Sequence, residues 1–415
     1  MYKLRPYQDE AATAAVDFLN NESGNGLIVI STGGGKSLII AEMAYRLNTN
    51  IIVFCPSKEI CLQNYEKMRS YGVECSMYSA SVGQKEVSRI TFAMIGSVKN
   101  KTEEFTDFKI AIVDEAHGVN SEQGQYLTFL STLGCRVIGL TATPYRLTSD
   151  TYYDYATRTH RAKNARLTML TNEENPFFKK IIYIVQTKTL LDQGYLADLK
   201  YYVVKPPRWN SDKMFVNGTG SEYAASSVQW MMEASDMNRH LIGIIRRLLH
   251  PKDGVPRKGI LVFTQFVEDA EEICQCVADS AYVCGTTTAK NRERILQEFK
   301  EGKIKVLLNV GVLTTGYDNP SLDTVVIGRP TMSLALYYQI VGRAIRPQQG
   351  KNAWIVDCVG NSERFGYVSN LYIAKSKLTD KEEVFGWVYS KKRNAYAWKQ
   401  LTGVNLQSAD ENLFT

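Results

Sequence analysis

The chain has few of the residues that bind transition metals or cross-link secreted proteins. It holds four histidines and eight cysteines among 415 residues, and no two cysteines are spaced as CxxC. Zinc sites of the finger and ribbon classes need paired cysteines and histidines at short spacing, so we expect no zinc site. Scattered cysteines are typical of the reduced thiols of a cytoplasmic protein.

Long apolar runs are also missing. The apolar runs, such as Ile51–Phe54 and Ile260–Phe263, have the length of a strand, whereas a membrane-spanning helix needs about 20 residues. The first six residues contain no apolar stretch of the kind found in a signal peptide. We therefore expect a cytoplasmic protein without membrane partners.

An excess of positive charge is present but mild, with a formal net charge of +6. Two segments concentrate it: residues 152–166 interleave aromatic and basic side chains, and Lys391, Lys392 and Arg393 lie between two aromatic stretches. Cations that neutralise phosphates, next to rings that stack on bases, are what a nucleic-acid surface requires. Solvated basic loops are the alternative for both segments.

A glycine-rich loop is the strongest feature of the N-terminal part. The apolar run Gly26–Ile30 leads into Ser31 and then into Thr32-Gly33-Gly34-Gly35-Lys36-Ser37. Glycines allow backbone N–H groups to converge on a phosphate, and a helix that starts at Lys36 adds its positive end. We expect Lys36 to bind the β- and γ-phosphates of a nucleotide and the Ser37 hydroxyl to bind Mg²⁺.

A second strand ends in two adjacent carboxylates. The run Ile110–Val113 is followed by Asp114, Glu115, Ala116 and His117. Asp114 at a strand end would hold Mg²⁺ through its hydration shell, and Glu115 is the natural general base for an attacking water. Together with the glycine-rich loop, these residues predict an enzyme that hydrolyses a nucleoside triphosphate.

The whole chain alternates strand-length and helix-length segments, and it does so twice. This pattern predicts an α/β fold with two parallel sheets, covered by helices on both faces, and a nucleotide cleft between the two lobes. We expect domains at residues 1–196, 197–360 and 361–415. Residues 144–198 and 206–235 are not assigned to either sheet, and 206–235 is expected to be irregular.

The C-terminal segment has its own pattern. Val384–Tyr389 and Ala395–Trp398 are aromatic stretches that flank a short polar run. They predict a β-hairpin with a cationic tip. The tip either contacts DNA near a branch point or is merely solvated while the hairpin packs on the second lobe.

Further motifs occur in the order of a known family. They are Arg5-Pro6-Tyr7-Gln8, Phe54-Cys55-Pro56-Ser57, Thr141-Ala142-Thr143-Pro144, Asn309 to Asp318, and Gln339 to Arg346. With the loop and the Asp-Glu-Ala-His run, the chain resembles the superfamily 2 helicases of the DEAH-box type. It is similar to bacterial RadD and to phage UvsW-type branch-migration helicases, which implies two RecA-like lobes.

The resemblance also implies roles for individual residues. ATP would be bound by the loop with Arg5, Gln8 and Asp318, and hydrolysis would involve Gln339, Arg343 and Arg346 from the second lobe. Residues His117, Thr141 and Thr143 would couple hydrolysis to strand movement. The DNA backbone would be held by Pro56, Ser57, Gly96, Ser97, Thr314 and Thr315, with Lys391, Lys392 and Arg393 as further contacts.

Two departures from those relatives shape the expected function. No cysteine follows Cys358, whereas RadD-type proteins have a C-terminal zinc module, and the Arg5–Gln8 motif stands almost at the first residue. The chain therefore resembles a motor with little beyond its two lobes. We expect it to be monomeric and to come from a bacterium or a phage-infected cell.

We expect an ATP- and Mg²⁺-dependent DNA helicase or translocase that acts on forked, four-way or duplex DNA in recombination, repair or replication. Three alternatives remain open. They are an RNA helicase, the motor subunit of a restriction system, and a nucleic-acid-stimulated ATPase clamp that does not unwind.

Overall fold

The structure is a computed structural model that describes residues 3–121, 123–154, 159–218, 221–313, 319, 321–347, 351–390 and 394–404. The chain forms two compact units: Met1–Arg146 with Thr168–Gln186, and Leu147–Leu167 with Thr187–Thr415. Each is described separately below. The expected division into domains at 1–196, 197–360 and 361–415 stays a prediction.

The first unit is built on an eight-stranded sheet in the order β10-β1-β7-β6-β2-β5-β3-β4. Neighbouring strands are parallel except for the antiparallel pair β3 and β4 at one edge. The strands are β1 (Gly26–Ile30), β2 (Ile51–Phe54), β3 (Ser76–Ser79), β4 (Gln84–Lys85), β5 (Ile90–Ala93), β6 (Ile110–Asp114), β7 (Arg136–Thr141) and β10 (Lys180–Val185).

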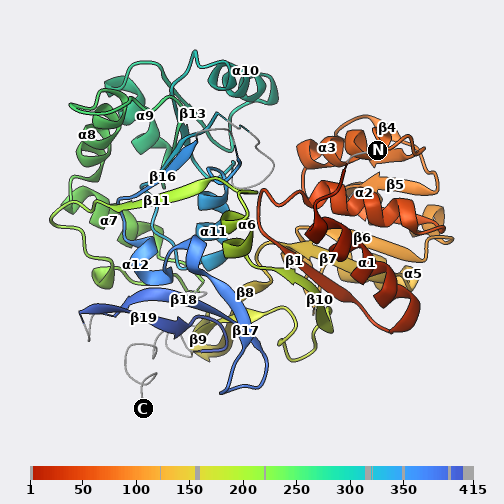
Figure 1. Cartoon of the computed structure of the whole chain (residues 1–415). Coiled ribbons are helices and arrows are strands. Elements are labelled where there is room, and N and C mark those ends of the chain that lie inside the picture. Colours follow the sequence, from red (N-terminus) through yellow and green to blue (C-terminus); the bar gives the residue numbers. More distant parts are fainter. Residues whose placement is uncertain are drawn as a thin grey trace. The chain divides into compact units, whose positions relative to one another are not determined.

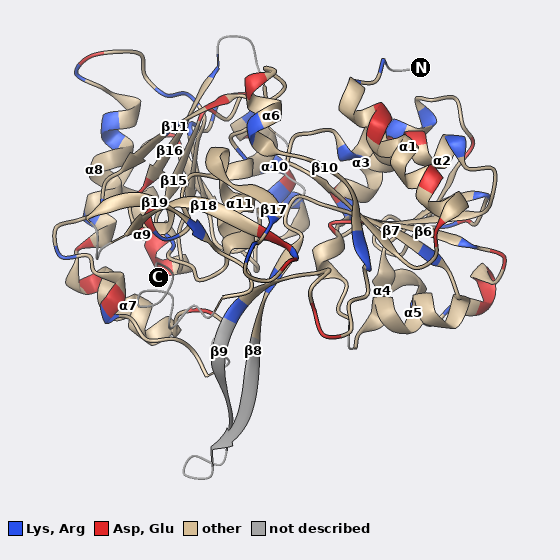
Figure 2. Cartoon of the chain, turned by 60° about the horizontal axis from the view of Figure 1, so that its bottom comes forward, with Lys and Arg blue, Asp and Glu red and all other residues tan. Residues whose placement is uncertain are grey.

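Helices cover both faces of this sheet. Figure 2 shows α1, α2 and α3 on one side of β6 and β7, and α4 and α5 on the other. The central strands β1 and β2 are buried along their whole length, which explains why they read as continuous apolar runs. The helices are α1 (Pro6–Asn21), α2 (Lys36–Arg46), α3 (Lys58–Arg69), α4 (Ile95–Val98) and α5 (Gln125–Leu133), with 3₁₀ turns at Thr102–Phe105 and Ala116–Gly118.

The second unit is built on a six-stranded sheet in the order β11-β16-β15-β12-β14-β13, in which all neighbours are parallel. In Figure 1, α8, α9 and α10 lie on one side of β16 and β11, and α11 and α12 on the other. The strands are β11 (Asp198–Val203), β12 (Ile260–Phe263), β13 (Ser280–Val283), β14 (Val306–Asn309), β15 (Thr324–Ile327) and β16 (Asn352–Asp357).

The helices of this unit are α6 (Thr187–Asp192), α7 (Ala225–Ala234), α8 (Met237–Leu249), α9 (Val267–Cys276), α10 (Ala289–Lys300), α11 (Leu334–Gly342) and α12 (Asn361–Phe365), with 3₁₀ turns at Ser211–Lys213 and Val368–Asn370. No helix within the described ranges is both long enough and apolar enough to cross a membrane.

Two small sheets complete the structure. Strands β8 (Tyr145–Asp154) and β9 (Thr159–Met169) pair with each other. Strands β17 (Tyr372–Lys375), β18 (Glu382–Ser390) and β19 (Ala395–Gln400) form an antiparallel sheet that we call the tail sheet. Trp387 faces Trp398 across β18 and β19, so the predicted hairpin is confirmed.

The two-sheet α/β fold predicted from the sequence is confirmed, but two segments were interpreted wrongly. Residues 144–198 supply β10, which pairs in parallel with β1 at an edge of the first sheet, and the start of β11 in the second sheet. Residues 206–235, expected to be irregular, contain the ten-residue helix α7. β10 contains an apolar run at residues 181–185 that was not assigned to the sheet, whereas α7 is short and carries polar residues, so it lacks a long amphipathic pattern.

Candidate active site

The loop that follows β1 has the backbone of a phosphate cradle. Gly33 and Gly35 adopt positive φ angles of 80° and 81°, and α2 begins at Lys36 directly after Gly35. Side chains are strained at such angles, so glycine is the residue that this turn requires. The loop thus ends at the N-terminus of an eleven-residue helix, where partial positive charge favours an anion.

Helix α1 braces the loop. The Tyr7 hydroxyl donates to the Gly34 carbonyl at 2.8 Å, and the Gln8 amide donates to the same oxygen at 3.2 Å. The Gln8 side-chain oxygen accepts from the Arg5 backbone N–H at 3.0 Å. A Cβ at Gly35 would come closer than van der Waals contact to the Gln8 amide nitrogen. Gln8 therefore sits against the loop, and Tyr7 is a loop contact that sequence reasoning missed.

Lys36 and Glu115 form an ion pair. The Lys36 Nζ lies 2.6 Å from Glu115 Oε1, and the two side chains are only 11% and 17% exposed. Glu115 has a positive φ of 52°, in the left-handed region that a non-glycine residue rarely adopts. Glu115 directly follows β6, and its conformation turns the side chain toward the loop. Backbone strain of this kind is often found at functional sites.

Asp114 is buried beside this pair. Burial raises the pKa of the Asp114 carboxyl to about 6, against the opposing effect of the nearby Lys36 charge. Its Oδ1 accepts from the Glu115 backbone N–H at 2.9 Å, and its Oδ2 accepts from the Asn64 amide at 3.2 Å. Asn64 belongs to α3 and is 1% exposed. No motif in the sequence singled it out.

His117 connects the carboxylate pair to the strand β7. Its Nδ1 lies 3.0 Å from the Thr141 hydroxyl, 3.2 Å from the Thr143 hydroxyl and 3.4 Å from Glu115 Oε2. Burial lowers the pKa of His117, so the ring is neutral at pH 7. The Thr143 N–H also donates to Thr141 Oγ1 at 3.0 Å. The three residues expected to couple hydrolysis to movement are thus in contact.

The strand order explains why these distant segments meet. β1, β7 and β6 are adjacent and parallel, with Val29 opposite Thr141 and Leu140 opposite Asp114. The glycine-rich loop, the Thr141–Thr143 segment and the carboxylates therefore follow three neighbouring strand ends. Ligands of open α/β sheets bind at this carboxyl edge.

The expected DNA-binding residues of the first unit follow a neighbouring pair of strands. β2 and β5 are parallel, with Phe54 opposite Ala93. Pro56 and Gly96 are exposed beyond those strand ends. Ser57 caps α3 by accepting from the Ile60 N–H at 3.3 Å, and Ser97 accepts from the Ala80 N–H at 3.0 Å. The structure brings the two segments to one edge of the sheet.

The expected catalytic residues of the second unit lie at the end of α11. Arg343 follows the helix, is 8% exposed, and its Nε donates to the Gln339 carbonyl at 3.3 Å. The Arg346 carbonyl accepts from Lys351 Nζ at 2.9 Å. Asp318, Thr314, Thr315, Lys391, Lys392 and Arg393 lie outside the described residues. The roles of all these residues remain predictions.

The chemistry of the described site suits a magnesium nucleotide. The loop presents backbone donors at a helix start, Lys36 and Ser37 stand at its end, and Asp114 and Glu115 supply oxygen atoms. Mg²⁺ prefers oxygen ligands, in keeping with this donor set. Among the described residues, no group of three His, Cys, Asp or Glu side chains is placed to hold a metal by itself.

Fold and site together define a two-unit α/β protein with a phosphate loop. The family model "Type III restriction enzyme, res subunit" matches residues 1–146, and the model "Helicase conserved C-terminal domain" matches residues 241–348. In these two parts the chain is similar to superfamily 2 helicases.

Several curated proteins are similar along most of the chain. The "Putative ATP-dependent helicase IRC3" of Saccharomyces cerevisiae is 25% identical over 389 residues, which is 86% of this chain and 52% of the relative. The "DNA 3'-5' translocase XPB2" of Sulfurisphaera tokodaii is 23% identical over 380 residues, 86% of this chain and 81% of the relative. The chain spans about half the length of IRC3.

Solved structures share the fold. A fragment of a putative HsdR subunit of a type I restriction enzyme from Vibrio vulnificus has a TM-score of 0.63 at 20% identity, covering 88% of this chain and 65% of that one. The type ISP restriction-modification enzyme LlaBIII bound to DNA has a TM-score of 0.62 at 16% identity, covering 86% of this chain and 28% of that one. These neighbours have two RecA-like lobes.

Proposed function

We propose that this chain is an ATP-dependent DNA motor that moves along branched or duplex DNA and thereby remodels forks or junctions. The observation that carries the proposal is the Lys36–Glu115–His117–Thr141 series of contacts at one sheet edge. It joins the phosphate loop to the segment expected to transmit movement. The names of the relatives, a DNA translocase and a putative ATP-dependent helicase, support DNA as the track.

In this proposal each residue has a defined task. Lys36 binds phosphate oxygens, and Ser37 and Asp114 hold Mg²⁺, which when bound withdraws charge from the phosphates. Glu115 accepts the proton of the attacking water. His117 and the two threonines sense the change at Glu115. Arg5, Gln8, Thr32 and Asp318 complete the nucleotide site, and Gln339, Arg343 and Arg346 act from the second unit.

The DNA backbone is proposed to run over Pro56, Ser57, Gly96 and Ser97 of the first unit and over Thr314 and Thr315 of the second. The basic tip at Lys391, Lys392 and Arg393 adds phosphate contacts. The same proposal includes the finer likeness to DEAH-box, RadD and UvsW-type enzymes. It also includes the monomeric state and the bacterial or phage setting.

A motor subunit of a restriction system is the second candidate. It is favoured by the family model of residues 1–146 and by the fold shared with restriction enzyme subunits. Such a subunit would act with a partner chain that carries nuclease and methylation functions. Stable capture of such a partner would favour this candidate over a motor that acts alone.

ATP hydrolysis measured with a panel of nucleic acids tests the proposal. The panel holds single-stranded DNA, duplex DNA, a four-way junction and RNA, next to a sample without nucleic acid. We expect the junction or the duplex to stimulate most, and Lys36→Ala to abolish turnover in every sample. Strongest stimulation by RNA would replace the DNA assignment, and equal rates without nucleic acid would contradict a motor that moves along a strand.

A further inference from the structure

We propose that the outer face of the tail sheet stacks the bases of a single-stranded nucleic acid. The inference goes beyond the ATP-driven motor, because the face lies outside both parallel sheets. It concerns binding alone and does not require hydrolysis.

One face of the tail sheet packs on the protein and the other is open. Val384 and Val388 are buried, and a Cβ at Gly386 would lie 2.9 Å from the Phe365 carbonyl of α12. Neighbouring residues on a strand point to opposite faces. Phe385 and Trp387 therefore point away from α12, onto the face that is less buried.

Aromatic rings gather on that outer face. Phe385 lies opposite Tyr372 on β17, and Trp387 lies opposite Trp398 on β19. Tyr372 and Phe385 stack with ring centroids 5.3 Å apart, and Tyr372 and Trp398 meet edge to face at 5.2 Å. Trp387 and Trp398 are also 5.2 Å apart. Four rings from three strands thus form one continuous cluster.

The cluster remains partly in solvent. Trp398 is 48% exposed, although large aromatic side chains usually bury most of their surface. A hollow of about 380 Å³ adjoins it, lined by Tyr372, Phe385 and Trp398 together with basic side chains. The basic members are Lys375, Lys377 and Lys399.

The charges around the hollow favour an anion. No carboxylate is among its lining residues. Asp380, which pairs with Lys375 at 2.9 Å, and Glu382 and Glu383 of β18 lie nearby but are not part of the lining. Rings on a flat sheet next to cations match the stacking of unpaired bases with neutralisation of their phosphates. Paired bases inside a duplex do not offer their faces in this way.

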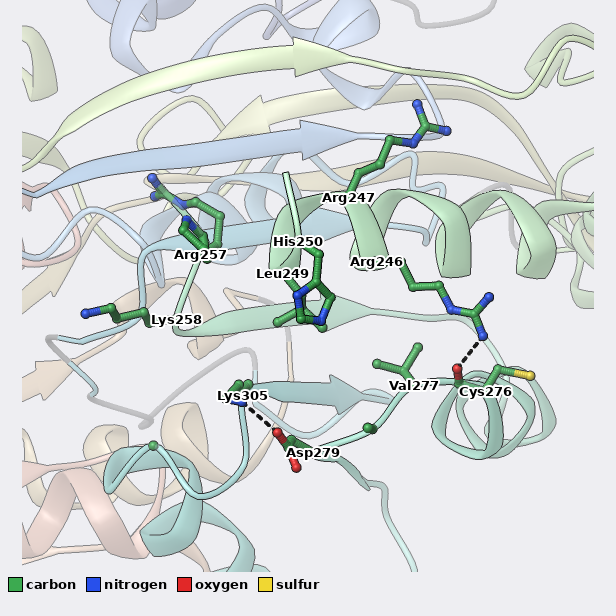
Figure 3. A pocket seen from close by; sticks show the side chains of 13 residues that line it. Arg246, Arg247, Leu249, His250, Arg257, Lys258, Cys276, Val277, Asp279 and Lys305 are labelled. Atoms are coloured by element: carbon green, nitrogen blue, oxygen red, sulfur yellow. Dashed lines mark hydrogen bonds and ion pairs between the residues drawn. The ribbon is translucent and has the colours of Figure 1, made fainter. Parts of the chain in front are cut away.

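A second, larger hollow lacks this combination. It has a volume of about 970 Å³ and lies on the second unit (Figure 3). Its lining is basic but holds no Phe, Tyr or Trp. Two of its cations have protein partners: Arg246 donates to the Cys276 carbonyl at 2.7 Å, and Lys305 pairs with Asp279 at 2.7 Å. These contacts stabilise the C-terminal end of α9 and the loop before β14, so these two basic side chains have a structural explanation.

Binding of short labelled oligonucleotides to the full chain, without nucleotide, tests the proposal. Arms with oligothymidylate and oligouridylate separate DNA from RNA as the source of the bases. We expect Trp398→Ala to weaken binding of one or both oligonucleotides about 5- to 100-fold, which is the range for the loss of one base–aromatic stack. Trp398→Phe should keep most of the affinity, and duplex binding should be unchanged.

A matched control is available in the same unit. Trp230 on α7 is 52% exposed and lies outside the tail sheet, so Trp230→Ala should bind as the wild type does. Equal affinity of Trp398→Ala and Trp398→Phe, with melting temperatures unchanged, would overturn the proposal. The proposal would also be overturned if Trp398→Ala sedimented differently from the wild type but bound the oligonucleotides with the same affinity. The face would then bind protein. Neither result bears on ATP hydrolysis, so this test and that of the motor fail independently.

Discussion

Lys36 and Glu115 contact each other in the structure, with Nζ and Oε1 2.6 Å apart. The residue expected to bind phosphate thus neutralises the residue expected to activate water. A phosphate between the two side chains would compete for Lys36 and release the Glu115 carboxylate. We therefore expect the pair to keep Glu115, the proposed general base, occupied until a nucleotide is bound.

Replacing Glu115 and replacing Lys36 should affect different steps of the reaction. Glu115→Gln removes the proton acceptor and should lower the turnover number by a factor of about 10² to 10⁴, the usual contribution of a general base. Its affinity for a fluorescent ATP analogue should be kept. Lys36→Ala should lose nucleotide affinity as well. A Glu115→Gln variant that still turns over at the wild-type rate would remove Glu115 from the mechanism.

Asn64 should set the pH dependence of hydrolysis. Burial raises the pKa of Asp114 to about 6, and the Asn64 hydrogen bond opposes that rise. In the proposed mechanism the ionised carboxylate holds Mg²⁺, so we expect hydrolysis to increase as pH rises through about 6. Asn64→Leu removes the donor and should move this rise to higher pH.

The pH profile of the turnover number checks this expectation. Leucine has the branched shape of asparagine and the same number of non-hydrogen side-chain atoms. Asn64→Leu also removes the Asn64 Oδ1, which has no donor among the described residues. A profile that keeps its position while the rate falls at every pH would indicate a packing role for Asn64 instead.

The raised pKa of Asp114 should also appear in stability. An unfolded Asp has a pKa near 3.9, and the folded value is about 6. Because the folded state binds the proton more tightly, this contribution to stability is complete below about pH 4 and is lost as pH rises to about 6. Asp114→Asn should therefore melt higher than the wild type at pH 8, with no advantage at pH 4.

Thermal melts without nucleotide measure this effect. The matched control is Asp107→Asn, because Asp107 is an exposed carboxylate of the same unit. If Asp114→Asn and Asp107→Asn changed the melting temperature equally at pH 8, burial of Asp114 would not be the cause.

Gly35→Ala should damage the loop in two ways. The φ of 81° would strain any side chain, and the new Cβ would meet the Gln8 amide. Gly72 has a similar φ of 73° with open space around it. Gly72→Ala should lose only about 1 kcal/mol of stability, whereas Gly35→Ala should lose more and also lose ATP hydrolysis. Similar losses of unfolding free energy in both variants would show that the Gln8 contact is unimportant.

The Thr141 hydroxyl should link hydrolysis to movement. Thr141→Val removes the partner 3.0 Å from His117 Nδ1 without changing the side-chain shape. We expect nucleic-acid-stimulated hydrolysis to continue while displacement of a third strand from a triplex falls about tenfold or more, since the hydroxyl's hydrogen bonds with His117 and with the Thr143 N–H are both lost. Thr141→Ser keeps the hydroxyl and should keep movement. Equal loss in both variants would point to packing.

Several features were predictable because they depend on local pattern. The apolar runs Ile51–Phe54 and Ile260–Phe263 are strands with the expected bounds. Central strands of a covered parallel sheet must be apolar along their length, so they are visible in the sequence. The edge strand β10 is apolar at residues 181–185 although it is only half-buried, and it was missed together with the short helix α7.

By itself, the sequence determined which residue types stand at the ends of the central strands, since the glycine-rich loop and the Asp-Glu pair each follow an apolar run. Only the tertiary structure decided which of these ends are neighbours. The order β1-β7-β6 joins segments more than a hundred residues apart, and it brings Asn64, with no motif of its own, onto Asp114. The outer face of the tail sheet has the same origin: strand register, which pairs Trp387 with Trp398 and Tyr372 with Phe385, places four scattered rings side by side.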